Sequence, residues 1–203
     1  RASVARLMTA REVQNLHKRY GRRVAVDDVS FTVDTGEIFG IIGPNGAGKT
    51  TTVESIAGLR VPDSGTISVL GLDPVKDRAE VRECLGVQLQ ESSFPDAITV
   101  SEALELYSSF YRNPVDWQDL MELLGLGDKR KARYKALSGG QKQRLSIALA
   151  LVGGPRIAIL DELTTGQDPQ SRRDTWSLIE RVRDSGKTIL LTTHFMDEAE
   201  RLA

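Results

Sequence analysis

The chain has 203 residues, of which 27 are Lys or Arg and 28 are Asp or Glu, so its formal net charge is −1. This balance excludes the basic stripe of a typical nucleic-acid binder, and no direct contact with nucleic acid is expected. A content of 40% hydrophobic and 27% charged residues is typical of an ordinary soluble domain.

Cysteine content and apolar run lengths exclude further classes of protein. The single cysteine, Cys84, cannot form an internal disulfide, and with two well-separated histidines it makes no zinc site. A reducing cytosolic setting fits this usage. No apolar run approaches the ~20 residues that cross a bilayer, and no signal-peptide pattern is present. Any link to a membrane is therefore expected to go through a partner.

The first part of the chain alternates between strand and helix patterns. Residues 1–8 show no clear period, whereas residues 12–20 and 24–33 contain alternating stretches that predict an antiparallel pair joined at residues 20–23. The elements expected next are a strand at 38–42, a helix from 48 to about 59, a strand at 66–70, a short helix at 77–84 and a strand at 85–89.

The character of the sequence changes between residues 91 and 137, where apolar residues recur at helical spacing. We interpret this stretch as an inserted helical lobe, after which the strand and helix alternation resumes and predicts a mostly parallel sheet. The elements expected there are a helix at 139–152, a strand at 157–160, a helix at 170–184, a strand at 188–193 and a helix at 195–203. A single domain over residues 1–203 is expected, with its C-terminal end truncated inside that last helix.

A glycine-rich loop follows the strand at 38–42 and leads into a helix. It matches the pattern G-x-x-x-x-G-K-[ST], in which backbone N–H groups and the helix N-terminus surround a phosphate chain. The residues expected to contact the nucleotide are Gly43, Pro44, Asn45, Gly46, Ala47, Gly48, Lys49, Thr50 and Thr51. Lys49 is expected to reach the β and γ phosphates, and the Thr50 hydroxyl to bind Mg²⁺. A flexible glycine turn is the alternative, but the flanking strand and helix favour binding of a nucleoside triphosphate.

Two later strands end in residues suited to catalysis. The apolar run at 157–160 ends in Asp161 and Glu162, and the strand at 188–193 ends in His194. Because open α/β sheets bind ligands at the carboxyl ends of their strands, Asp161 is predicted to hold Mg²⁺ and Glu162 to activate the attacking water as a general base. His194 is predicted to contact the γ-phosphate or that water. The alternatives are an acidic helix cap and a packed or surface histidine.

A second glycine pair opens the helix at 139–152. Ser138 is a good N-cap, and Gly139, Gly140 and Gln141 follow it at a helix N-terminus that is suited to phosphate. One chain offers no obvious second phosphate to this site, which indicates that the ligand belongs to a partner subunit.

Together, the phosphate loop and residues 137–141, Leu-Ser-Gly-Gly-Gln, resemble the nucleotide-binding subunit of an ABC transporter, and the resemblance covers residues 11–203. It implies an α/β P-loop NTPase core with a mostly parallel sheet, an N-terminal antiparallel β lobe and an inserted α-helical lobe. It also implies that two ATP molecules lie between the phosphate loop of one subunit and the Ser-Gly-Gly signature of the other. Within this family, residues 168–173 and 194–202 resemble exporters of the drug- or polysaccharide-efflux kind.

The resemblance also implies individual roles and partners. Tyr20 would stack on the adenine, although a plain strand-end tyrosine is the alternative. Gln90 would sense Mg²⁺ as one of its ligands, Asp168 would contact the second subunit, and His194 would be the switch histidine. A separately encoded transmembrane permease is the expected partner, with the chain peripheral on the cytoplasmic face of the cell membrane.

The sequence departs from the family pattern at two positions. Leu163 stands where proline usually follows the acidic pair, and Gln167 stands where leucine usually precedes Asp168. Loss of proline removes a constraint on φ, so we expect a freer backbone in the loop at the subunit interface.

Two other functions compete with the transporter hypothesis. One is a soluble ABC-type ATPase acting on ribosomes, DNA or chromosomes, and the other is a catalytically silent regulatory module. Ser138 follows Gly48 by only 90 residues (138 − 48), which leaves no room for the long coiled coils of the chromosome type. Intact Lys49, Asp161, Glu162 and His194 argue against a silent module.

Overall fold

The computed structural model describes residues 9–89 and 94–202, which build two sheets of different kinds. An antiparallel sheet has the strand order β2-β1-β4, and a parallel sheet has the order β3-β7-β6-β5. Their strands are β1 (Thr9–Tyr20), β2 (Arg23–Asp34), β3 (Ile38–Ile42), β4 (Ser64–Val69), β5 (Leu85–Gln88), β6 (Ile157–Asp161) and β7 (Thr188–Thr193). Both the antiparallel N-terminal lobe and the parallel core sheet are therefore confirmed.

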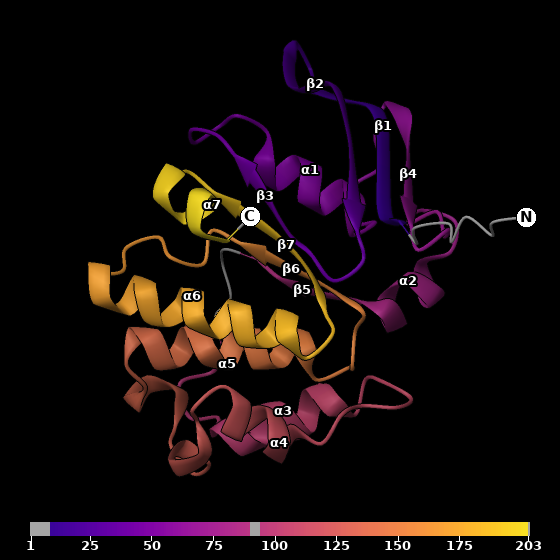
Figure 1. The fold of residues 1–203 in the computed structure, drawn as a ribbon. Helices are drawn as coiled ribbons and strands as arrows, with labels where there is room; N and C mark the ends of the chain where they lie inside the picture. Colours follow the sequence, from indigo (N-terminus) through magenta and orange to yellow (C-terminus); the bar gives the residue numbers. More distant parts are fainter. Residues whose placement is uncertain (1–8, 90–93, 203) are drawn as a thin grey trace, which may run out of the picture.

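Helices cover both faces of the parallel sheet. In Figure 1, α5 and α6 lie below the sheet and α1 lies above it, while α3 and α4 form a further layer beyond α5. The α-helices are α1 (Lys49–Ile56), α2 (Arg78–Cys84), α3 (Val100–Ser108), α4 (Trp117–Leu123), α5 (Gly139–Leu151), α6 (Pro169–Asp184) and α7 (Met196–Leu202), with short 3₁₀ turns at Gly127–Lys129 and Tyr134–Ala136. None of these helices is long and apolar enough to span a bilayer.

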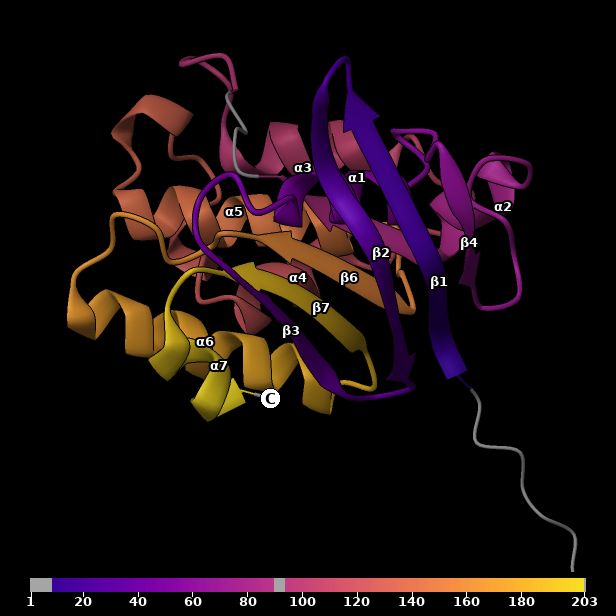
Figure 2. The same ribbon diagram turned by 90° about the horizontal axis from the view of Figure 1, so that it is seen from above.

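Alternation along β6 divides the hydrophobic core into two clusters. Ile157 and Ile159 point to one face and join Val53 of α1 and residues of the antiparallel sheet, whereas Ala158 and Leu160 point to the other face. All residues of β6 and β7 are buried, as a strand covered on both faces requires. α1 is therefore held between the two sheets, as the view in Figure 2 also shows.

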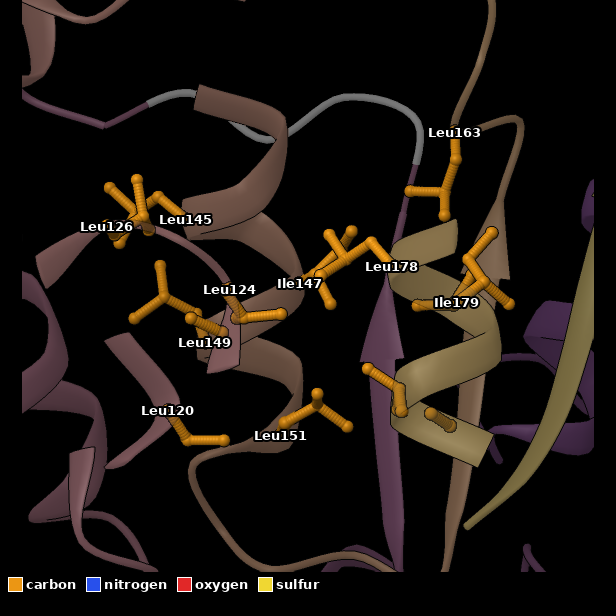
Figure 3. Close-up of a cluster of buried hydrophobic side chains, with 14 of the residues drawn as sticks. Leu120, Leu124, Leu126, Leu145, Ile147, Leu149, Leu151, Leu163, Leu178 and Ile179 are labelled. Carbon is orange, nitrogen blue, oxygen red and sulfur yellow. The ribbon is translucent and has the colours of Figure 1, made fainter. Parts of the chain in front are cut away.

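The second cluster joins the helical layers to the sheet. Leu145, Ile147 and Leu149 of α5 are its centre, with Leu120 and Leu124 on the side of α4 (Figure 3). Leu163 reaches down from the loop after β6 toward Leu178 and Ile179 of α6 and is 4% exposed. The loop that follows the acidic strand end is thus anchored in the core by one side chain.

Local turns explain where elements begin and end. The antiparallel pair turns at Gly21, which has φ 56°, and Tyr20 pairs with Arg23 as expected. Helix α1 ends at Ile56 rather than near Leu59, because Gly58 has φ 70° and terminates the helix. A Cβ at Gly58 would lie 2.3 Å from the Pro74 carbonyl oxygen, so this turn requires glycine.

Arg11 of β1 is a buried cation. Its side chain is 1% exposed, and none of its three guanidinium nitrogens has a partner in the part of the chain that the structure describes. Burial lowers the pKa of Arg11 to about 9, and Cys84 acts in the opposite direction. At neutral pH the guanidinium is therefore a buried, poorly compensated charge that destabilises the fold.

We expect Arg11→Met to stabilise the protein by roughly 1–4 kcal/mol at pH 7, the range seen when buried ionic groups give way to packed apolar ones. Above the folded pKa of about 9 and up to the higher pKa of an ordinary arginine, the unfolded state binds more protons than the folded state. The advantage of Arg11→Met should therefore shrink as the pH rises above 9. Urea unfolding at pH 7 and at alkaline pH measures both effects, with Arg19→Met on the exposed side of β1 as the control. A loss of stability at pH 7 would contradict this account.

Candidate functional site

The loop between β3 and α1 has a backbone that its glycines dictate. Gly46 has φ 82°, and Gly48, the N-cap of α1, has φ 92°. A Cβ at Gly48 would lie 2.1 Å from the Ala25 carbonyl oxygen of β2, so no larger residue fits there. This close approach holds the loop between β2 and the start of α1, where the helix presents its first N–H groups.

Lys49 folds back into this loop. Its side chain is 5% exposed, and Nζ donates to the carbonyl oxygens of Gly43 at 2.8 Å and Pro44 at 3.2 Å. The same Nζ lies 3.1 Å from Oε1 of Glu162. The ammonium group is thus placed between the loop backbone and Glu162, the general base predicted from the sequence.

Asp161 lies at the end of β6 and is fully buried. Its Oδ2 accepts a hydrogen bond from the Thr50 hydroxyl at 3.3 Å, and its Oδ1 accepts one from the Thr192 hydroxyl. The Asp161 N–H donates to Oε1 of Gln88 on the neighbouring β5 at 3.2 Å. Burial raises the pKa of Asp161, and the repulsion from Glu162 acts in the same direction.

Glu162 has a left-handed backbone with φ 49°, which is uncommon outside glycine and costs free energy. Its N–H donates to the carbonyl oxygen of Thr192 at 3.2 Å and to the hydroxyl of Thr192 at 3.1 Å, and these two contacts hold the conformation. Oε2 lies 3.9 Å from Nδ1 of His194, beyond hydrogen-bond distance. The carboxylate is therefore placed between Lys49 and His194.

Two cavities of similar size are lined by the predicted site residues. The first, of ≈ 600 Å³, is lined by Tyr20, Arg23, Ala25, Asn45, Gly46, Gly48, Lys49, Thr50, Thr51 and Glu162. Tyr20, 42% exposed, stands at its rim with the guanidinium of Arg60 5.5 Å from the ring centre. This cavity is of the size that small-molecule sites have.

The second cavity, of ≈ 590 Å³, lies where the N-termini of α5 and α6 meet. Ser138 caps α5, because its hydroxyl accepts from the Gln141 N–H at 3.2 Å. The Ser138 N–H in turn donates to Oε1 of Gln141 at 3.0 Å. Asp168 caps α6 by accepting from the N–H groups of Gln170 at 3.0 Å and Ser171 at 3.1 Å. Hydrogen bonds from Ser171 lower the pKa of Asp168. The lining is Gly125, Ser138, Gly139, Gly140, Gln141, Gln143, Arg144, Thr165, Gly166, Gln167, Asp168 and Ser171.

The structure thus brings the predicted residues together in two groups. Tyr20, the phosphate loop, Asp161, Glu162 and His194 surround one site. Residues 138–141 and Asp168 surround the other, and among the described residues the two cavities share no lining residue. Ala47 lines a neighbouring apolar cleft of ≈ 490 Å³, and its N–H donates to the Pro44 carbonyl oxygen within the loop at 3.2 Å. Gln90 lies outside the described residues.

Three polar residues at the first site were not predicted from the sequence. Thr192 contacts both Asp161 and Glu162, Gln88 accepts from the backbone of Asp161, and Arg23 donates to the Gly46 carbonyl oxygen at 3.3 Å. Thr192 could have been found because it lies near the same strand end as His194. Gln88 and Arg23 carry no signal in the sequence that separates them from ordinary strand residues.

The oxygen atoms at the end of β6 fit a magnesium ion. The Thr50 hydroxyl and the Asp161 carboxylate, 3.3 Å apart, are hard oxygen donors of the kind that Mg²⁺ prefers. Within the described ranges no cluster of three or more acidic, histidine or cysteine side chains forms a complete protein cage. This matches the usual case in which one or two protein ligands complete a coordination shell of phosphate and water oxygens.

Comparison with known proteins gives the family. The ABC transporter family profile matches residues 26–165, so the chain belongs to the ABC transporter family and carries its ATP-binding domain. Such domains hydrolyse ATP to power transport. The Nod factor export ATP-binding protein I of Burkholderia orbicola is 44% identical over 197 residues, covering 94% of this chain and 64% of that protein. The protein of the same name from Rhizobium etli is 42% identical over 201 residues, covering 96% and 63%.

The chain therefore spans somewhat less than two thirds of the length of these curated relatives. Solved structures show the same fold. The ADP conformation of MJ1267, an ATP-binding cassette of an ABC transporter, superposes with a TM-score of 0.84 at 27% identity, covering 95% of this chain and 84% of that one. The cbiO1 protein from Clostridium perfringens, part of the transporter complex cbiONQ, gives 0.84 at 27% identity, covering 93% and 80%.

Proposed function

We propose that the chain binds Mg-ATP at the first cavity and hydrolyses it as the motor subunit of an exporter. The observation that carries this proposal is the convergence of Lys49, the adjacent Asp161 and Glu162, and His194, from three separate segments, on the phosphate loop. Tyr20 at the cavity rim stacks on the adenine, and the loop N–H groups with Lys49 hold the phosphates. The relatives are named for export, which supports export over import.

Hydrolysis follows from the side chains that face the γ-phosphate. Glu162 accepts a proton from the attacking water, because its carboxylate is held next to the loop and away from bulk solvent. His194 stabilises that water or the γ-phosphate from the other side of Glu162. Thr50 and Asp161 hold Mg²⁺, with Gln90 as a further ligand, and the ion supplies charge neutralisation at the phosphate oxygens.

The second cavity is the reason for proposing a dimer. Two helix N-termini and the Ser138-Gly139-Gly140 backbone face it, an arrangement that favours a phosphate group. Because this cavity shares no described lining residue with the phosphate loop, its phosphate comes from the ATP of a second nucleotide-binding subunit. ATP is then enclosed between the phosphate loop of one subunit and the signature of the other.

The same assignment sets the remaining partners and the place of the protein in the cell. A separately encoded transmembrane permease binds the subunit, which is peripheral on the cytoplasmic face of the membrane. The described helices contain none that could cross a bilayer, and cbiO1 of the related structure is described as part of a transporter complex. Residues 1–203 then act as one ATPase domain in which the lobe at about 91–137 is the helical subdomain.

The experiment uses the full-length protein carrying Glu162→Gln, tagged and purified from mildly solubilised cells in Mg-ATP. A multi-spanning membrane protein that co-elutes in stoichiometric amount is the expected result and supplies the permease. The matched control adds Lys49→Ala, which removes the phosphate contact and should abolish ATP-dependent enclosure of a second subunit. Co-elution of ribosomes or DNA without a membrane protein would overturn the exporter assignment and leave the ATP site intact.

A further inference from the structure

Glu198 is a buried carboxylate that the catalytic scheme above does not use. It lies on α7 and is 2% exposed. Its Oε2 accepts a hydrogen bond from the Thr164 hydroxyl at 2.9 Å, and its Oε1 accepts one from Nε1 of Trp176 at 3.0 Å. Thr164 is 1% exposed and Trp176 is 8% exposed, so both donors are also out of water. A buried polar group of this kind is retained only where its hydrogen bonds are satisfied.

Two of the three segments that Glu198 joins lie directly after proposed catalytic side chains. Thr164 follows Glu162 in the loop after β6, and α7 starts immediately after His194 and Phe195. Trp176 belongs to α6, the helix that begins at the second cavity and packs in the core. One carboxyl group therefore fixes the segment of His194 relative to the segment of Glu162, with α6 as the common support.

The loop between Glu162 and Asp168 is itself bonded to α6. The hydrogen bond from Thr164 therefore ties Glu198 to a loop that α6 holds in place. Gln167 donates from Nε2 to the carbonyl oxygen of Leu163 at 3.1 Å and accepts from the Thr175 hydroxyl at 3.0 Å. The Leu163 side chain is packed against Leu178 and Ile179 (Figure 3). The two positions where the sequence departs from its family thus hold each other in place.

A second contact between the same segments lies closer to the histidine. The Arg172 guanidinium of α6 lies 4.1 Å from the centre of the Phe195 ring, and its Nη2 donates to the carbonyl oxygen of Gln167 at 3.4 Å. The Phe195 ring is in turn 4.1 Å from the His194 ring, centre to centre. The segment that carries His194 therefore contacts α6 at two places, at Phe195 through Arg172 and at Glu198 through Trp176. The contact of Glu198 is the more deeply buried of the two.

We propose that Glu198 is a positioning residue that sets the place of His194 relative to Glu162 through its hydrogen bonds to Thr164 and Trp176. The inference rests on the proposed catalytic roles of His194 and Glu162. Because His194 Nδ1 and Glu162 Oε2 are 3.9 Å apart, a shift of well under 1 Å in α7 decides whether the two groups engage the same water. Loss of the carboxyl group frees α7 while the phosphate loop stays intact, so chemistry slows and nucleotide binding does not weaken.

A double-mutant cycle in the full-length ATPase tests this role. Glu198→Ala is expected to lower kcat by about 10-fold or more with KM for ATP within about 2-fold of wild type. Glu198→Gln can accept from Trp176 and donate to Thr164, so it is expected to restore most of the rate. In a His194→Ala background, Glu198→Ala should lower kcat no further, because the effects of substitutions at residues that act through one another are not additive. Glu200→Ala, exposed on the same helix, is the matched control and should behave as wild type.

Each outcome decides the matter. If His194→Ala alone keeps the wild-type kcat, the catalytic role of His194 is wrong and the positioning role is wrong with it. If His194→Ala lowers kcat but Glu198→Ala lowers it equally in both backgrounds, only the positioning role is wrong. If circular dichroism shows that Glu198→Ala does not fold, the same cycle is run with Trp176→Phe, which removes one donor and keeps an aromatic ring. Additivity of Trp176→Phe with His194→Ala would then overturn the proposal.

Discussion

Glu162→Gln is expected to lower kcat for ATP hydrolysis by about 10² or more, the usual contribution of a general base. The substitution keeps the size of the side chain and the hydrogen bonds of its backbone to Thr192, so the left-handed turn at this position should persist. ATP affinity should be unchanged or higher, because the variant removes the negative charge 3.1 Å from Lys49 that competes with phosphate. Phosphate release at saturating Mg-ATP and equilibrium binding of a fluorescent ATP analogue measure the two quantities.

The control for this variant is Glu105→Gln, which changes an exposed carboxylate on α3 and should leave both quantities at wild-type values. Hydrolysis by Glu162→Gln at the wild-type rate would remove Glu162 from the role of base. A large loss of ATP affinity would instead assign to Glu162 a binding contact that the present geometry does not include.

Ser138→Arg should abolish ATP hydrolysis while the isolated subunit binds ATP as tightly as wild type. Ser138 lines the second cavity, and an arginine there fills the space that the proposed sandwich reserves for the partner's triphosphate. The phosphate loop is unaffected because the first cavity does not include this residue. Hydrolysis assays and ATP binding at concentrations that keep the protein monomeric separate the two effects.

Loss of the N-cap must be distinguished from the added bulk. Ser138→Ala removes the hydrogen bond to the Gln141 N–H and costs ~1 kcal/mol of helix stability without filling the cavity. This control should retain a substantial part of the activity. If Ser138→Arg weakens ATP binding to the monomer, the assignment of the signature to a partner's nucleotide is wrong.

Backbone features of the site could be predicted from the sequence, because they depend on local patterns. The phosphate loop needs glycine at fixed places, and the apolar run of β6 ends in its acids at the edge of the sheet where ligands bind. The alternation of apolar and polar residues within 24–33 predicts a strand of the antiparallel lobe in the same way. Each of these signals lies within a short stretch of chain.

Side-chain partners across the fold could not be predicted in this way. Thr192 meets Asp161 and Gln88 meets the Asp161 N–H only because β7, β6 and β5 are neighbours in one register. The loop after Glu162 was expected to be freer without its proline. The structure instead shows Gln167 bonded to Leu163 and Thr175, a compensation that needs the position of α6 to be known.

The ion pair of Lys49 and Glu162 places the proposed phosphate ligand next to the proposed base. The Lys49 ammonium contacts two carbonyl oxygens of the loop and the carboxylate that would activate water. Under the proposed roles, a phosphate that draws Lys49 toward itself also changes the ion pair of Glu162, so one ammonium group contacts both the substrate and the base.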